Sequence, residues 1–228
     1  MQIFGERVIQ FNQSLSFNGK LPMNVKVLNP FMENPETMVV MKHFYDKFYN
    51  DNHPRKFILA INPGRLGAGT TGIPFTDTKR LESECGIKMK SANTYEVSST
   101  FVYRMIKEFG GVESFYSKFY INSVFPLALI QKNKKGNWVN ANYYDSQEIF
   151  KSVSPKIVEN IQQNIDLGLQ TDEVFIMGKK NADFFNKINK EFNFFDKISV
   201  LEHPRYIQQY KLKELDFYLE KYLQILGK

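Results

Sequence analysis

The apolar residues of the chain gather in short continuous runs that alternate with longer stretches of helical periodicity. The clearest run covers residues 56–61, in which every residue after the first is apolar. Such a run is typical of a strand that is buried on both faces of a parallel sheet. Similar short runs at residues 119–124, 173–177 and 198–201 predict three more strands.

Segments with apolar residues at helical spacing lie between these strands and on either side of them. Asn34 followed by Pro35 predicts a helix start. Further helices are expected over residues 77–84, 98–109, 145–167, 182–190 and 207–226, the third with a restart at Ser154 and Pro155. This alternation predicts an α/β protein, a three-layer αβα sandwich around a central, mostly parallel sheet of about four strands.

A single domain is expected over residues 1–228, because this length suits one hydrophobic core. Residues 1–33 are interpreted as an irregular N-terminal arm, with a helix near Arg7–Ser16 and a short extended piece at residues 25–28. The apolar fraction of 43% is close to that of globular proteins, which argues against disorder.

Composition limits which partners, metals and cofactors the protein is expected to bind. The net charge of +6 makes a polyanion such as nucleic acid a candidate partner. Cys85 is the only cysteine and the three histidines are scattered, so we expect no disulfide framework, no metal and no cofactor. No apolar run is as long as a transmembrane helix, and the first residues lack the pattern of a signal peptide. We therefore expect a cytoplasmic, monomeric protein without a membrane partner.

The segment from Asn62 to Phe75 follows the first predicted strand and carries four glycines and two prolines. This composition excludes a regular helix and indicates a loop of defined shape. Loops at the carboxyl end of parallel strands are where α/β proteins bind ligands. We therefore expect the loop to form one wall of a binding site.

The residues that leave the four predicted strands should lie together at one edge of the sheet. They are Asn62, Asn122, Gly178 with Lys179, and His203 with Pro204. The set has no carboxylate pair and no serine–histidine–acid order, and Glu173 breaks the phosphate-loop pattern. An amide presents a donor beside an acceptor, which matches the pairing edge of a pyrimidine. Phe75 adds a ring on which a base can stack.

The loop from Asn62 to Phe75 resembles the first motif of the uracil-DNA glycosylase superfamily, and most of all its single-strand-selective monofunctional (SMUG-type) branch. That branch shows Asn-Pro-Gly, a glycine three residues later, and then Thr-Gly-x-Pro-Phe at the same spacing. His203-Pro204 is similar to the start of the second motif. Asn122 to Leu127 is similar to an Asn-x-x-Pro-Leu segment of the branch, with one extra residue before the proline.

The resemblance implies a role for each matched residue. Asn62 would hold the attacking water and His203 would stabilise negative charge on the departing base. Phe75 would stack on the flipped base, Asn122 would read its pairing edge, and Gly64 would belong to the same base-binding loop. A donor aimed at the developing negative oxygen stabilises the transition state more than the ground state. The base must leave the DNA stack to reach such a site.

The chain departs from the branch after His203. The branch continues His-Pro-Ser-Pro-Arg-Asn, whereas this sequence has Arg205 and Tyr206 after the proline. These two residues are the substitutes we expect to contact DNA, together with Lys179 at a helix start and Lys211. The difference leaves the strand preference and the base range open.

The main hypothesis is a monofunctional DNA glycosylase of base excision repair, which removes uracil or a related damaged base from DNA and leaves an abasic site. A second is a non-catalytic binding module for nucleic acid or nucleotides on the same fold. A third is an enzyme acting on free nucleosides or on phosphates through the glycine-rich loop. Taken singly, Asn62 and Asn122 could cap turns, Phe75 could belong to the core, and His203 could be a loop histidine.

Overall fold

A parallel sheet of four strands lies at the centre of the chain, whose computed structural model describes residues 2–228. The strands are β2 (Arg55–Ala60), β3 (Phe119–Ser123), β6 (Leu169–Met177) and β7 (Lys197–Leu201), in the order β3-β2-β6-β7. The four predicted strands are all present and all parallel, which confirms the predicted α/β class.

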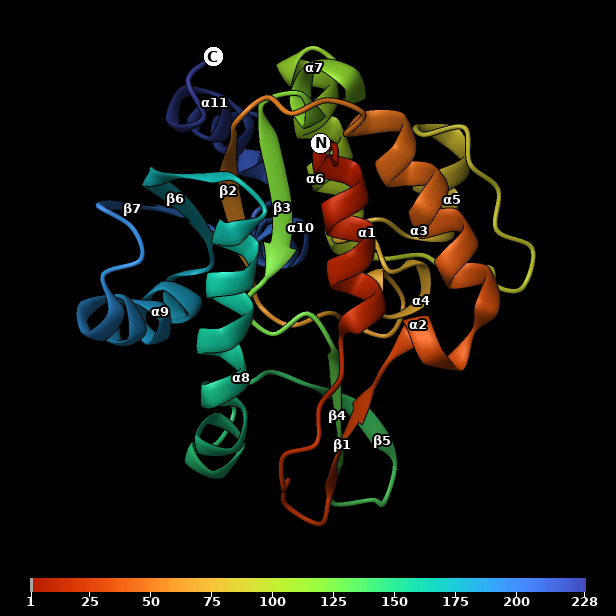
Figure 1. Ribbon diagram of the computed structural model, residues 1–228, viewed down its shortest axis with the longest axis vertical. Coiled ribbons are helices and arrows are strands. Elements are labelled where there is room, and N and C mark those ends of the chain that lie inside the picture. Colours follow the sequence, from red (N-terminus) through yellow and green to blue (C-terminus); the bar gives the residue numbers. More distant parts are fainter. Residues whose placement is uncertain (1) are drawn as a thin grey trace.

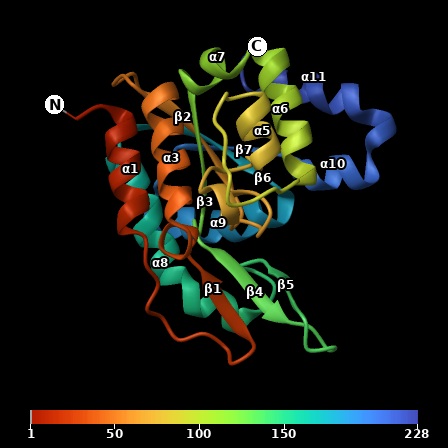
Figure 2. The same ribbon diagram turned by 90° about the vertical axis from the view of Figure 1, so that its right-hand side faces the viewer.

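Helices cover both faces of this sheet (Figure 1). The helices of the described residues are α1 (Phe4–Ser14), α2 (Pro30–Glu33), α3 (Pro35–Phe48), α4 (Ala68–Thr71), α5 (Thr78–Ser83), α6 (Val97–Phe109), α7 (Val112–Tyr116), α8 (Gln147–Asp166), α9 (Lys179–Phe192), α10 (Pro204–Tyr210), the 3₁₀ turn η1 (Leu212–Glu214) and α11 (Leu215–Ile225). Seen along the sheet edge, α1, α3 and α8 lie on one side, and α5, α6, α10 and α11 lie on the other (Figure 2).

Aromatic side chains hold the two helical layers to the sheet. On one face, Tyr120 of β3 contacts the rings of Phe4 and Tyr45, from α1 and α3. On the other face, Phe119 packs edge-on against Phe109 of α6. Successive residues of a strand point to opposite faces, so neighbouring positions on β3 belong to different layers. This alternation decides which β3 side chains can reach a site on the α6 side.

A second, smaller sheet was not predicted. It is antiparallel, with the order β1-β4-β5, and its strands are β1 (Val25–Leu28), β4 (Ala128–Lys132) and β5 (Trp138–Ala141). It lies beyond the carboxyl ends of the parallel strands, where the chain runs on from β3 into β4 (Figure 2). The turn between β4 and β5 carries Lys134 and Lys135 and is closed by a hydrogen bond from Asn133 N to Asn137 O.

Residues 2–33 of the segment interpreted from sequence as an irregular arm include a packed helix and a paired strand, and Met1 lies outside the described residues. Helix α1 lies against α3 and buries Phe4, Val8 and Phe11. Strand β1 pairs with β4 in the small sheet. The N-terminal segment therefore contributes to the core as well as to the second sheet.

The loop from Asn62 to Phe75, expected to exclude a helix, contains the four-residue α4. Two predicted helices also differ from the structure in their continuity. Helix α8 runs without a restart through Pro155, because Ile149, Val153 and Ile157 keep one face buried. Pro155 has no N–H for the Lys151 carbonyl, which instead accepts a hydrogen bond of 3.4 Å from the Ser154 hydroxyl. The C-terminal helix expected over residues 207–226 is divided into α10 and α11, with η1 between them.

Candidate active site

A cavity of about 180 Å³ opens at the carboxyl ends of the parallel strands. The loop after β2 supplies Asn62, Gly64 and Phe75 to its wall, and the segment after β7 supplies His203 and Arg205. Residues that are far apart in sequence therefore meet there, as expected for strand ends of a parallel sheet. The small sheet closes another side through β5 and the residues that follow it.

Both polar atoms of the Asn62 side-chain amide are held by the backbone at the end of β5 and just after it. Its Nδ2 donates to the Ala141 carbonyl at 2.8 Å, and its Oδ1 accepts from the Tyr143 N–H at 2.8 Å. The Tyr143 hydroxyl in turn donates to Oδ1 of Asn181, which is fully buried. These contacts fix the Asn62 amide, and one lone pair of its Oδ1 remains free to face a ligand.

Phe75 closes the loop with a left-handed backbone, at φ 53°. Non-glycine residues rarely adopt this conformation, and bulky ones at such φ values mark strained positions that often lie at functional sites. The backbone turns the ring into the cavity wall, where its centroid lies 6.1 Å from that of His203, with an angle of 60° between the rings. The loop is thus shaped to present an aromatic face beside the imidazole.

His203 is the N-cap of α10, and its Nδ1 accepts a hydrogen bond of 3.1 Å from the Arg205 N–H. The ring proton of the neutral imidazole therefore sits on Nε2. This Nε2 is shielded from solvent and has no hydrogen-bond partner within residues 2–228. Burial, with a smaller effect of the Arg205 charge, lowers the pKa of His203 to about 4. The site therefore holds a neutral donor that awaits an acceptor.

The structure does not bring Asn122 to this cavity. Its Nδ2 donates to the Tyr120 hydroxyl at 2.9 Å and to Asn164 of α8 at 3.0 Å. Asn122 and Tyr120 share the strand face that meets α1 and α8, whereas the cavity lies on the opposite side. The next residue, Ser123, lines the cavity instead. Its hydroxyl has no hydrogen-bond partner among the described residues, while its N–H donates to Asn122 Oδ1.

Glycines let the loop fold tightly on itself. A Cβ atom at Gly69 would lie only 2.5 Å from the Gly64 carbonyl oxygen, so any side chain there would push the loop open. At Gly64 a Cβ would lie 3.3 Å from Asn140 Nδ2, at the cavity wall. Gly64 therefore lies at the ligand-facing surface, as expected from its place in the motif.

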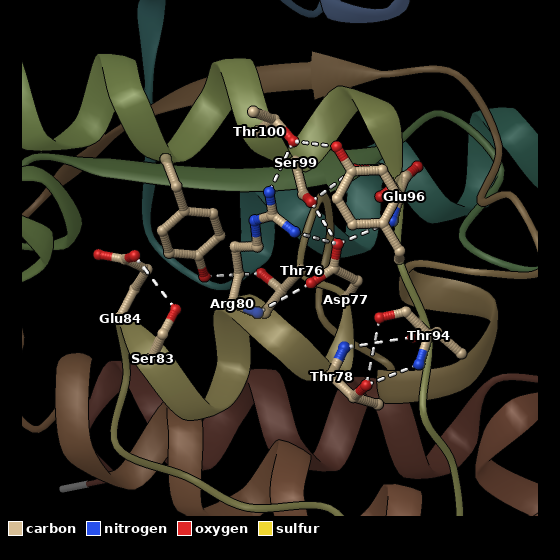
Figure 3. Close-up of polar contacts among 12 residues, drawn as sticks. Thr76, Asp77, Thr78, Arg80, Ser83, Glu84, Thr94, Glu96, Ser99 and Thr100 are labelled. Atoms are coloured by element: carbon tan, nitrogen blue, oxygen red, sulfur yellow. Dashed lines mark hydrogen bonds and ion pairs between the residues drawn. The ribbon is translucent and has the colours of Figure 1, made fainter.

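Sequence reasoning missed Glu96, which lines the cavity just before α6. The buried Asp77 carboxylate accepts hydrogen bonds from the Glu96 N–H at 2.7 Å and from the Ser99 hydroxyl at 2.6 Å (Figure 3). Burial and the charge of Asp77 raise the pKa of the Glu96 carboxyl to about 7, and Arg205 opposes them. A lone acidic residue on a loop carried no sequence signal for this position.

The residues expected to contact DNA lie on and near α10. Arg205 is exposed at the cavity wall, and the Tyr206 side chain is 43% exposed. Lys179 is exposed at the first position of α9, directly after Gly178, which approaches the His203 side chain. Lys211 follows α10 and forms an ion pair of 2.8 Å with Glu214. Arg205 and Tyr206 thus lie on the helix that His203 begins, and Lys179 follows the glycine next to His203.

The arrangement combines a fixed amide, an aromatic plate and a neutral hydrogen-bond donor, which suits a planar base with a carbonyl group. Within residues 2–228, no three His, Cys, Asp or Glu side chains lie close enough together to hold a metal ion. In the same residues no helix has both the length and the apolar character needed to cross a membrane.

Comparisons with known proteins agree with this geometry. The family model of the uracil DNA glycosylase superfamily matches residues 47–227. The chain is also similar to the crystal structure of wild-type SMUG2 from Pedobacter heparinus, with a TM-score of 0.96 and 47% sequence identity. This similarity covers 99% of the present chain and 97% of the other. No curated protein matches the sequence. The family match includes every parallel strand and all the residues around the cavity.

Proposed function

This chain belongs to the uracil DNA glycosylase superfamily, and on that premise we propose that Asn62, Phe75 and His203 act on a base flipped out of DNA. The protein is a DNA glycosylase of base excision repair, a monofunctional uracil-DNA glycosylase-like hydrolase. It hydrolyses the N-glycosidic bond and leaves an abasic site. The roles of the individual residues are our proposal.

The unpartnered Nε2–H of His203 is the observation that carries the assignment. When the bond between C1′ and the base breaks, its electron pair stays with the base and negative charge develops on the carbonyl oxygen. The His203 Nε2–H donates to that oxygen, and the bond strengthens as the charge grows. A neutral imidazole keeps this donor without giving up its proton.

Asn62 positions the water that completes the reaction. The amide is a poor base, so it accepts a hydrogen bond from the water through Oδ1 and aims the oxygen at C1′. The water oxygen bonds to C1′ as the base departs, and its proton passes to solvent or to the base. The backbone contacts of Ala141 and Tyr143 hold the amide in this orientation before substrate arrives.

Phe75 and Ser123 recognise the flipped base in this scheme. The Phe75 ring stacks on the base face, which is worth about 1–3 kcal/mol. The Ser123 hydroxyl takes the edge-reading role expected for Asn122, because Ser123 lines the cavity and Asn122 faces α8. A hydroxyl donates or accepts as needed, so it admits more than one base edge. This suits a site that takes uracil and related damaged bases.

The enzyme is tested with single- and double-stranded oligonucleotides that each contain one uracil, followed by alkali to break the abasic product. The wild-type protein should yield strand breaks at the uracil. His203→Ala and Asn62→Ala should each reduce kcat by about a hundredfold to a thousandfold at a temperature well below the melting temperature of both variants. DNA binding without base release would instead favour a non-catalytic module, and unchanged rates in both variants would refute their roles.

Arg205, Tyr206, Lys179 and Lys211 form the DNA-contacting surface in this proposal. Arg205 and Tyr206 enter the space that the flipped base vacates, and the lysines contact phosphates. The protein acts as a monomer in the cytoplasm. Sedimentation with and without DNA tests the monomer, and cell fractionation tests the compartment.

A further inference from the structure

Glu96 places a carboxyl group in the cavity wall, and the proposed reaction assigns it no role. It lies at the wall that also carries Asn62, Phe75 and His203. Its Oε2 is shielded from solvent and has no hydrogen-bond partner among residues 2–228. A buried polar atom without a partner is costly, and in a ligand site it marks a group whose partner arrives with the ligand.

The backbone of Glu96 has a structural role, but its side chain does not share it. The Glu96 N–H donates to Asp77, and the Glu96 carbonyl accepts from the Ser99 N–H, which fixes the start of α6 (Figure 3). The carboxyl extends from this anchored backbone onto the loop after β2. A Cβ at Gly67 would lie 2.1 Å from Glu96 Oε2, so glycine at that position makes room for the carboxyl.

The charges around Glu96 favour its neutral form. Asp77, on the α5 side, is paired with Arg80 and still raises the Glu96 pKa to about 7, together with burial. From α10, exposed Arg205 opposes this shift, and His203 is neutral above about pH 4. DNA phosphates that engage Arg205 would weaken its support for a carboxylate. No donor of the described residues binds Oε2, as a stable buried carboxylate would require.

We propose that Glu96 contacts the flipped base as a neutral carboxyl, donating one hydrogen bond and accepting another. A carboxyl group presents O–H beside C=O, which is complementary to a ring carbonyl beside N–H, as in uracil. This inference rests on the proposed function and adds a base-binding group to it. Together with Ser123 it supplies the hydrogen bonds to the base that Asn62 and His203 do not.

Binding experiments separate base contact from a structural role. The probes are an oligonucleotide with 2′-fluoro-arabino-uridine, which resists hydrolysis, and the same oligonucleotide with a tetrahydrofuran abasic analogue. Glu96→Ala should weaken binding of the first by about tenfold to a hundredfold and leave the second unchanged. Glu84→Ala, which removes an exposed carboxylate, serves as the control and should change neither. Equal weakening of both probes, or of neither, would overturn the proposal.

The pH dependence of uracil excision tests the protonation state. The wild-type kcat/KM should fall as pH rises through about 7, because the carboxyl is lost to its ionised form. Glu96→Gln keeps a donor beside an acceptor, so it should excise uracil within a few-fold of wild type at pH 6 and lose this alkaline limb. A Gln variant that is folded but inactive at every pH would contradict the proposal, because it would require a carboxylate. Wild-type protein that releases no base would instead reject the proposed function.

Discussion

At the scale of single residues, two ionisable groups in the cavity have opposite effects on how the free energy of unfolding depends on pH. The pKa of His203 is lowered from 6.5 to about 4, so its contribution to stability is lost as pH falls through that interval. The pKa of Glu96 is raised from 4.5 to about 7, so its contribution is present at low pH and is lost as pH rises to 7. The two effects offset each other over most of this range.

Single substitutions should uncover each effect. As pH falls from 6.5 to 4, the free energy of unfolding of Glu96→Gln should decrease by about 3 kcal/mol more than that of wild type. The reason is that, of the two groups, only His203 still titrates in this variant. In His203→Asn it should rise by about 3 kcal/mol relative to wild type as pH falls from 7 to 4.5. Urea unfolding at half-unit pH intervals measures both. Variant curves parallel to the wild-type curve would show that neither group is buried as described.

Asn122 and Ser123 show why one position of the site escaped prediction. Residues at strand ends can be identified from apolar runs, and Asn62 and His203, which follow such runs, both line the cavity. Phe75 was predicted from the motif of its loop and lines the cavity as well. Which of two adjacent strand residues faces the cavity depends on the strand's rotation in the sheet, which the apolar run on both faces does not reveal. The extra residue between Asn122 and Pro126 was the one sequence sign of the difference.

Matched alanine variants distinguish the two neighbours. Asn122→Ala removes the donor that serves the buried Tyr120 hydroxyl and Asn164 Oδ1, so it should lower the free energy of unfolding by about 1–3 kcal/mol. Its kcat/KM for uracil DNA should stay within a few-fold of wild type. Ser123→Ala should do the reverse, with unchanged stability and a kcat/KM reduced by about tenfold. Urea unfolding and single-turnover excision measure the two quantities. If Asn122→Ala lost activity while Ser123→Ala lost only stability, the base edge would be read by Asn122.

At the scale of elements, the Asp77 carboxylate joins α5 to α6. It accepts from the Arg80 N–H as the N-cap of α5, and from the Glu96 N–H and Ser99 hydroxyl at the start of α6 (Figure 3). Asp77→Ala should lower the free energy of unfolding by about 2–3 kcal/mol, because a cap and buried hydrogen bonds are lost together. Asp46→Ala removes an exposed carboxylate paired with Lys42 and should cost less than about 0.5 kcal/mol. Equal melting temperatures in the two variants would contradict this account.

Elements with a strong local signal were predicted, and elements defined by their partners were not. The four parallel strands have apolar runs that can be recognised from the local sequence, without knowledge of the strands they pair with. Strands β4 and β5 are short and joined by a polar turn, so only their pairing with each other and with β1 makes them strands. Pro155 broke the predicted helix at that position, yet burial of one face of α8 keeps the helix continuous.

At the scale of the whole molecule, the parallel sheet sets the place of the site and the small sheet completes it. Asn62 leaves β2, but the groups that orient its amide belong to Ala141 and Tyr143, at the end of β5. A parallel sheet alone would leave this amide free to rotate. The second sheet thus preorganises a residue on the first, which is why the site could be located from sequence while its support could not.

The net charge of +6 should appear as a strong salt dependence of DNA binding. The logarithm of the binding constant should fall linearly with that of the salt concentration, with a slope of about −0.9 for each phosphate neutralised. Lys179→Ala removes an exposed cation at the start of α9, directly after the glycine next to His203, so it should reduce the size of the slope by about 1. Lys211 is already paired with Glu214, so Lys211→Ala should change the slope by less. Fluorescence anisotropy with uracil-free DNA at several salt concentrations measures both slopes. A larger change in slope for Lys211→Ala than for Lys179→Ala would indicate that the DNA phosphates lie near the end of α10 and not near α9.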